Sequence, residues 1–300
     1  MKKPSLGLLR EKIMSILTKA IIDNQIVVTA VETKDIVNKA IKLHGLSPVA
    51  AAALGRTLTM AAMMGKELKN ESDYLTIKIN GGGPLGQITV CADGKGNVKG
   101  MVDNPVVETS LNANGHLAVG EAVGNDGSLT VIKDLGMKQP YVGSSKLVSG
   151  EIAQDFAYYF ATSEQQPCGV TLGVGVSKKM CTSAGGVFVQ VMPNCSEELL
   201  SKVETVMYAM DEMSYQFDHS TAREVITRFF GQFDPQFTED SEVRYKCGCS
   251  KRKINRVVKS LGKDEAQSII DEVGQIEVCC HFCNKKYVYK QEDVDKLFNK

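Results

Sequence analysis

The chain of 300 residues contains no tryptophan, and aromatic residues make up only 6% of it. It also lacks an excess of either charge, because Lys+Arg and Asp+Glu both number 35. Such a balance does not indicate nucleic acid or an anionic membrane surface as a partner, and we expect neither. The hydrophobic fraction of 43% is ordinary for a globular protein with a substantial core.

Long apolar runs are also missing. The N-terminus, "MKKPSLGLLREKIMSILTKAI", opens like a signal peptide, but charged residues interrupt it between positions 10 and 19, so none is expected. The longest small-apolar stretch, residues 47–65, is crossed by Arg56 and is typical of a buried helix, not a membrane span. Ser47 is suited to its N-cap and Pro48 to its first helical position.

Histidine is scarce, with four residues, and no convincing acid–base pair is present. His44, His116 and His219 are typical of surface or cap positions. Cys168 and Cys181 have no His, Asp or Asn near them in sequence that would activate a nucleophile. The sequence therefore predicts a protein that is not an enzyme.

The first two thirds of the chain predict a mixture of helices and strands. Residues 33–45, 47–65 and 149–163 have helical patterns, whereas 73–102, 124–136, 169–179 and 184–193 have the patterns of strands. The loop "GGGPLG" lacks the Lys-Ser/Thr of a P-loop and opens no helix, so we expect a hairpin turn. We predict one α+β domain over residues 1–195.

A linker rich in phenylalanine is predicted over residues 196–240. Its first helix carries Asn194 and Glu197 at capping-box spacing. An apolar stripe follows, made of Leu199, Val203, Val206 and Met210. In its second helix Thr221 and Glu224 form the box, and Gly231 is the expected C′ stop.

Five of the ten phenylalanines fall in this linker: Phe217, Phe229, Phe230, Phe233 and Phe237. Two short helices cannot bury that much aromatic surface on themselves, and helices of this length are marginal alone. The linker must therefore pack on a neighbour, either the first domain or the tail.

The tail, residues 241–300, predicts two short helices and a strand–knuckle–strand segment. Ser250 would cap the first helix, and Gly262 and Gly274 would end the two helices. So small a unit with few large apolar groups needs a further source of stability, such as a structural metal.

Four of the nine cysteines supply that metal site. Cys247 and Cys249 form a C-x-C pair, Cys280 and Cys283 a C-x-x-C pair, and the two pairs are what a tetrahedral Cys₄ zinc site needs. Asn284 follows, where a residue tolerant of a left-handed conformation is useful. Four other thiols, Cys91, Cys168, Cys181 and Cys195, are scattered singly, which does not suggest a secreted disulfide framework, and we expect a reducing cytoplasm.

Two further residues compete for the site. Cys279 should point to the opposite face of its strand from Cys280, as a half-buried small hydrophobe. His281, at an x position of the knuckle, is expected to point outward. Lysines and Arg252 surround the site in sequence and favour thiolate over thiol. A disulfide across C-x-C would be strained and labile, so a permanent zinc ribbon and a redox switch both remain open.

The motifs resemble those of the redox-regulated heat-shock chaperones, the thirty-three-kilodalton chaperonins. The tail motifs are "CGCS" and "VCCHFCNKKY". The body contributes "SPVAAAALGRTLTMAAMMG", "GGGPLGQITVCAD", "VKGMVDNP", "LTVIKDLGMKQPYVG", "SGEIAQDFAYYFATSEQQP", "LGVGV" and "AGGVFVQVMP". The resemblance covers about residues 20 to 298, nearly the whole chain.

The resemblance implies an α+β body, a helical linker and a small C-terminal Cys₄ zinc domain. It implies an ATP-independent holdase that is inactive when reduced and zinc-bound. Oxidation would expel zinc, form the disulfides Cys247–Cys249 and Cys280–Cys283, unfold the linker and give a homodimer that holds unfolding or oxidatively damaged clients.

A physical reason accompanies that expectation. Zinc binding free energy is folding free energy in a small metallodomain, so the tail would unfold without zinc and the linker would lose the surface on which it packed. Phe229, Phe230, Phe233 and Phe237 are then the candidate client-binding residues. The extra Cys279 departs from the family pattern and could capture a ligand cysteine, and the run after "CGCS" is unusually basic.

Two alternative functions belong to other classes of protein. A zinc-ribbon protein that binds nucleic acid or ribosomes would use the basic "KRKINR" helix, although the neutral overall charge and the aromatic linker argue against it. A thiol oxidoreductase would need a C-x-x-C that opens a helix, whereas this one ends a strand.

Overall fold

The structure is a computed structural model that describes residues 15–109, 111–112, 115–178, 180–210 and 212–298. Residues 1–14, where most of the signal-peptide question falls, lie outside this described part. Within it, no helix is long and apolar enough to cross a membrane.

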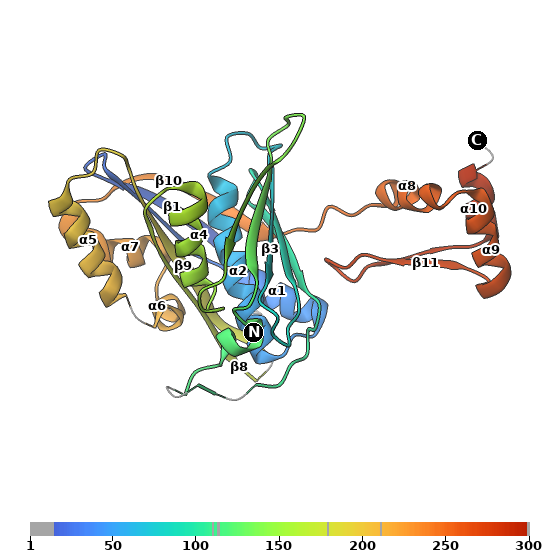
Figure 1. The fold of residues 1–300 in the computed structure, drawn as a ribbon, viewed down its shortest axis with the longest axis horizontal. Coiled ribbons are helices and arrows are strands. Elements are labelled where there is room, and N and C mark those ends of the chain that lie inside the picture. The colour runs from blue at the N-terminus through green and yellow to red at the C-terminus, as the bar shows by residue number, and fades with distance from the viewer. Residues whose placement is uncertain (1–14, 110, 113–114, 179, 211, 299–300) are drawn as a thin grey trace, which may run out of the picture.

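A ten-stranded mixed sheet forms the centre of the body (Figure 1). Its strands are β1 (Ser15–Ile22), β2 (Ile26–Glu32), β3 (Tyr74–Asn80), β4 (Ile88–Asp93), β5 (Asn97–Val102), β6 (Ser128–Asp134), β7 (Tyr141–Lys146), β8 (Cys168–Ser177), β9 (Met180–Val191) and β10 (Gln236–Tyr245). Their spatial order is β7-β6-β3-β4-β5-β10-β1-β2-β9-β8. Neighbours are antiparallel except β5 and β10, which are parallel. The predicted α+β class is confirmed.

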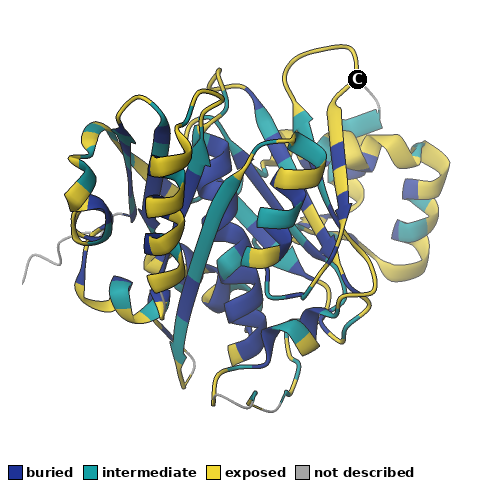
Figure 2. Cartoon of the chain, turned by 60° about the vertical axis from the view of Figure 1, so that its left-hand side comes forward, coloured by how far each residue is buried: buried dark blue, intermediate teal, exposed yellow. Residues whose placement is uncertain are grey.

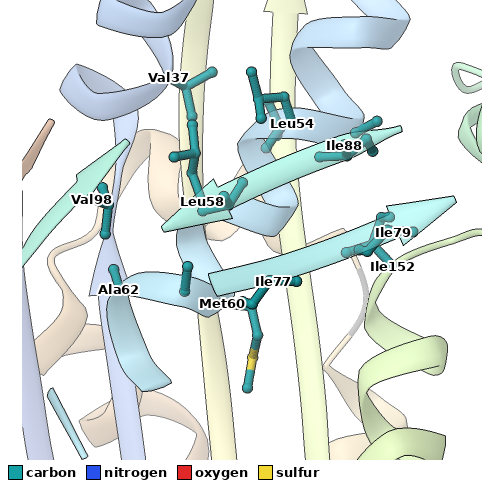
Figure 3. Packing of buried hydrophobic residues seen from close by; sticks show 14 of the residues in the cluster. Val37, Leu54, Leu58, Met60, Ala62, Ile77, Ile79, Ile88, Val98 and Ile152 are labelled. Carbon is teal, nitrogen blue, oxygen red and sulfur yellow. The ribbon is translucent and has the colours of Figure 1, made fainter. Parts of the chain in front are cut away.

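One face of the sheet is covered by helices α1 (Lys34–His44) and α2 (Pro48–Lys66), with the short helices α3 (Val119–Val123) and α4 (Ala153–Tyr159) and the π-helix η1 (Phe160–Glu164) nearby. Helix α2 is buried along almost its whole length, as predicted. Figure 3 shows Leu54 and Leu58 of this helix among Ile88 and Val98 of the sheet. Because α2 is apolar on all sides, it suits a position inside the body.

The glycine-rich loop between β3 and β4 is a turn, as predicted. Gly81 and Gly83 lie directly against the backbone of Val123 and Gly124, where a Cβ atom would overlap. The Gly83 N–H donates to the Val123 carbonyl at 3.0 Å. These glycines therefore serve close backbone packing.

The opposite face of β1, β2 and β9 carries the linker helices (Figures 1 and 2). These are α5 (Glu197–Ala209), α6 (Met213–His219) and α7 (Ala222–Phe230), followed by the 3₁₀ turn η2 (Gly231–Phe233). The apolar stripe of α5 is buried here, as predicted, and so are Phe217 and Phe230. The neighbour on which the linker packs is the body. The tail forms no part of this core.

The close fit of α6 depends on Gly185 in β9. A Cβ atom there would overlap the ring of Phe217, which lies flat against the strand. The absence of a side chain at this position lets the helix reach the sheet.

One expected helix boundary is wrong, and another is right in position but not in conformation. Ser196, not Asn194, is the N-cap of α5, and its hydroxyl accepts from the Leu199 N–H at 3.4 Å. Helix α7 ends at Phe230 with Gly231 as its C-cap, as predicted, but Gly231 has φ −55 and begins η2 instead of adopting a left-handed conformation. The Thr221–Glu224 capping box is confirmed.

The tail has a core of its own. It consists of α8 (Lys251–Leu261), α9 (Lys263–Val273), the hairpin β11 (Ile276–Cys279) and β12 (Lys286–Tyr289), and α10 (Gln291–Phe298). The Ser250 cap and the stops at Gly262 and Gly274 are confirmed. Figure 1 shows the tail projecting from the body, with one end of the β11–β12 hairpin turned toward it.

Candidate metal centre

Two segments bring the four predicted cysteines together. Cys247 and Cys249 lie between β10 and α8, and Cys280 and Cys283 lie at the turn of the β11–β12 hairpin. In that turn the Cys283 and Asn284 N–H groups both donate to the Cys280 carbonyl, at 3.1 and 2.7 Å. Asn284 has φ 53, the left-handed conformation expected from the sequence.

The sulfur positions suit a tetrahedral metal ion. All four Sγ atoms lie within 4.8 Å of one another. Cys247 Sγ is 3.6 Å from Cys280 Sγ, and Cys249 Sγ is 3.4 Å from Cys283 Sγ. A tetrahedron with Zn–S bonds of about 2.3 Å separates its sulfurs by about 3.8 Å. The four predicted ligands therefore form a group that could hold one metal ion.

The protonation states of these thiols are tightly linked. Burial alone would raise the pKa of Cys249, but hydrogen bonds from the Tyr287 hydroxyl, 3.3 Å away, and from the other cysteines lower it to about 7. Burial raises the pKa of Cys247 and Cys283. Metal binding must displace the protons that these thiols retain, so the affinity of the site rises with pH.

Cys279 lies outside the four-thiol group. It pairs with Lys286 across the hairpin and its side chain is exposed, so the expectation of a half-buried position is wrong. The physical reason is that this face of the two-stranded hairpin has no second layer over it at Cys279. His281 is also exposed and is not among the grouped ligands.

The metal centre is docked to the body through contacts that sequence reasoning missed. The Tyr245 hydroxyl, at the end of β10, lies 2.6 Å from the Phe282 carbonyl in the knuckle and 3.0 Å from the Gly100 carbonyl in β5. The Asn284 amide donates to the Leu43 carbonyl at 2.6 Å. Phe282 and Asn284, which flank Cys283, thus hold the knuckle on the body.

Two further groups complete this junction. The Lys99 ammonium lies 4.6 Å from the centre of the Phe282 ring, a cation–π distance. His44 Nε2 is 3.4 Å from the Tyr245 oxygen, and burial lowers the pKa of His44. The junction therefore contains a group that resists protonation.

The cysteines of the body differ chemically from those of the tail. Burial raises the pKa of Cys168 and of Cys181 to about 12. Both remain thiols near neutral pH, and thiols react far more slowly with oxidants than thiolates. Cys249 in the tail, whose pKa is lowered to about 7, therefore carries far more thiolate at neutral pH than either of them.

The four candidate client-binding phenylalanines lie together over the outer face of the sheet. Phe230 is fully buried, whereas Phe229, Phe233 and Phe237 are partly buried against the same core. The guanidinium of Arg223 in α7 lies 4.1 Å from the centre of the Phe237 ring and forms a 2.6 Å ion pair with Asp240 in β10. Helix α7 and strand β10 are thereby joined.

The mixed sheet with its covering helices defines an α+β class, and the chain is similar to known proteins over nearly its whole length. The family model described as "Hsp33 protein" matches residues 15–290. The chain is 46% identical to the 33 kDa chaperonin of Alkaliphilus oremlandii over 91% of this chain and 92% of that protein. It is 42% identical to the 33 kDa chaperonin of Bacillus licheniformis over 95% and 99%.

A solved structure agrees. The 33 kDa chaperonin of Thermotoga maritima superimposes with a TM-score of 0.87 at 34% identity, over 95% of this chain and 98% of that one. The chain belongs to the Hsp33 family, as the sequence motifs predicted, and this membership supports a chaperone role. The relatives are named chaperonins, which favours a function other than catalysis.

Proposed function

We propose that this chain is a redox-regulated, ATP-independent holdase that is inactive when reduced and bound to one Zn²⁺. The observation that carries the proposal is the group of four Sγ atoms within 4.8 Å, one of which belongs to Cys249 with its lowered pKa. Its partners are unfolding or oxidatively damaged proteins. It acts in the cytoplasm and forms a homodimer when oxidised.

Zn²⁺, when bound, ties the C-x-C loop to the hairpin turn, and its binding free energy adds to the folding free energy of the tail. Oxidation removes these ligands. In each pair two thiolates become one disulfide and give two electrons to hypochlorous acid, which takes up a proton and becomes chloride and water.

Pairing within each motif, Cys247–Cys249 and Cys280–Cys283, is proposed for a chain whose tail has opened. The short S···S contacts of the folded cluster join the two motifs instead. Those cross-motif contacts depend on the folded tail. Once it opens, partners one or two residues apart meet far more often than partners in different motifs.

The route from the tail to the linker needs a correction. The linker does not pack on the tail, so unfolding of the tail cannot uncover it directly. Strand β10 connects them: Tyr245 holds the knuckle, and Asp240 in the same strand pairs with Arg223 in α7. We propose that loss of the metal undocks the knuckle, loosens β10 and releases α7 with its phenylalanines.

The division into a body of residues 1–195, a linker of 196–240 and a switch domain of 241–300 is retained in this proposal as a functional one. Strand β10 spans the last of these boundaries. The linker and the switch therefore share one strand, which is the element through which they are coupled.

The test measures zinc and client holding in one sample. Hypochlorous acid is added to the reduced full-length chain while a chromophoric chelator reports zinc and light scattering reports aggregation of a thermally unfolding protein. Zinc release in step with aggregation suppression, both reversed by reductant and zinc, is the expected result. If zinc stays bound, or leaves without any gain in client holding, the tail is only a structural zinc ribbon and the proposed switch is wrong.

The client surface needs its own variants. Replacing Phe230 would leave a large cavity in the core, at a cost of about 3–5 kcal/mol, and would unpack α7 before any client is added. Phe229→Ser with Phe233→Ser alters only partly buried rings. We expect this double variant to release zinc normally yet to hold client less well. Undiminished holding would place the client surface elsewhere.

A further inference from the structure

A basic groove lies between α8 and α10 in the tail, away from the docked knuckle. It encloses about 560 Å³. Five cationic side chains line it: Lys251, Arg252, Arg256, Lys259 and Lys296. Asp293 is the one carboxylate that lines it.

The charges of this groove are largely uncompensated. Lys251 pairs with Asp293 at 3.4 Å. The other four cations are exposed and have no ion pair within the described part of the chain. Helix α8 contains no acidic residue, whereas the first turns of α9 and α10 contain acidic residues. The net charge of zero, from which we expected no nucleic-acid partner, therefore conceals a locally positive surface.

The packing of α8 fixes the direction of these side chains. Ile254 and Val258 bury one side of the helix in the core of the tail. Arg252, Arg256 and Lys259 follow one another on the exposed side at i, i+4 and i+7, one helical turn of about 5.4 Å apart. They form a line of positive charges with Lys296 across the groove.

The floor of the groove is closed to bases. Tyr289 is 1% exposed, and its hydroxyl donates to the Asn255 side chain at 2.8 Å. With its ring buried, it offers no stacking platform. Recognition in this groove must therefore come from charge and not from base identity.

We propose that the α8–α10 groove binds the phosphate backbone of single-stranded nucleic acid. A line of cations at a regular spacing suits a polymer that carries one negative charge per repeat. Guanidinium groups also match phosphate oxygens in a two-pronged geometry. A flat bilayer cannot enter a concave groove. The one amide that lines the groove, Asn255, has its oxygen bonded to Tyr289, and charge dominates the lining, so RNA and DNA of equal length are expected to bind alike.

The salt dependence of binding has a definite size. Single strands release about 0.7 counterion per neutralised phosphate, so four contacts give a slope of about −2.8 in log K against log salt. From 50 to 200 mM salt the affinity then falls about 50-fold. With two contacts removed, the same change costs about 7-fold.

The experiment measures fluorescence anisotropy of a labelled 20-nucleotide poly(U) strand and its DNA counterpart with the reduced, zinc-loaded full chain. The test variant is Arg256→Gln with Lys259→Gln. The control, Lys39→Gln with Lys138→Gln, makes the same change in net charge at exposed positions of the body. Zinc content and melting temperature confirm that each variant is folded.

The expected result is a 50-fold salt effect for the parent chain and the control, and weaker binding with a 7-fold effect for the test variant. Absence of binding by the parent chain would overturn the proposal, and so would equal losses in the two variants. Equal competition by a poly-glutamate peptide would overturn the assignment to nucleic acid. Because the assay needs no oxidation and no client, its outcome is independent of the holdase proposal.

Discussion

The Tyr245 hydroxyl is the contact through which we expect the tail and the body to communicate, and Tyr245→Phe removes it alone. The hydroxyl lies 2.6 Å from the Phe282 carbonyl and 3.0 Å from the Gly100 carbonyl. Its one hydrogen serves one carbonyl at a time. The contacts of its oxygen with Gly100 N and His44 Nε2 are long, at 3.4 Å each, so the substitution removes about one strong hydrogen bond. The junction is half-buried, and water can reach part of it.

The magnitude follows from that geometry. A typical internal hydrogen bond contributes about 0.5–1.5 kcal/mol, and a carbonyl left dry would cost more. We therefore expect docking to weaken by about 1 kcal/mol, which is about a fivefold rise in the undocked population. The Asn284 contact to Leu43 survives, so the knuckle stays mostly docked. Adding Asn284→Gly, which keeps the left-handed backbone, should raise the effect to roughly 30-fold.

The assay is the rate of zinc transfer to a chromophoric chelator at a fixed, low dose of oxidant, with hydrogen exchange of β10 measured beside it. The matched control is Tyr289→Phe, which removes a hydroxyl bonded to Asn255 inside the tail. Tyr245→Phe should release zinc about fivefold faster and expose β10 amides, whereas the control leaves β10 protected. If Tyr245→Phe releases zinc at the parent rate with β10 still protected, the knuckle contact does not couple the two units.

Three further perturbations test other parts of the argument. Gly185→Ala should push α6 off the sheet, so the reduced, zinc-loaded chain should bind a hydrophobic dye and hold client. Gly231→Ala is the control, because a Cβ atom there would meet nothing, and it should change neither dye binding nor client holding. Burial lowers the pKa of His44, so the docked state is favoured at neutral pH and weakens as the pH falls below about 6.5. Hydrogen exchange of the β10 amides should therefore become faster below that pH, and His44→Gln should remove this pH dependence. Cys279→Ser should keep full zinc stoichiometry, as a metal assay would show, and give a simpler disulfide map after oxidation.

Several features with a local signal were predictable from the sequence, although the N-cap expected at Asn194 was not one of them. The spacing of Cys247, Cys249, Cys280 and Cys283 predicted that these four thiols lie together, because C-x-C and C-x-x-C motifs converge thiols by their own turn geometry. Residues 47–65 likewise predicted a buried helix, because the helix carries small apolar residues on all of its sides. The helix stops at Gly262 and Gly274 depended only on their immediate neighbours.

Long-range contacts were not accessible in the same way. The strand β10 alternates only weakly and carries several charges, so nothing in its own pattern distinguishes it from a linker. Asn284 was predicted for its backbone conformation, yet its side chain also binds Leu43, far away in sequence. The linker helices showed that they needed a partner surface without showing which one. Tyr245 has the same limitation, since its role depends on three separate segments.

Strand β10 also sets an order on synthesis. It separates β1 from β5 in the sheet, so Thr18 meets Asp240 across 222 positions of sequence. While the ribosome is still making the linker, the edges of β1 and β5 have no partner, and closing so long a loop is slow. Until β10 emerges, the nascent chain must carry two open sheet edges of the kind that promote aggregation. During its own synthesis this protein therefore exposes aggregation-prone sheet edges, the hazard against which chaperones protect other chains.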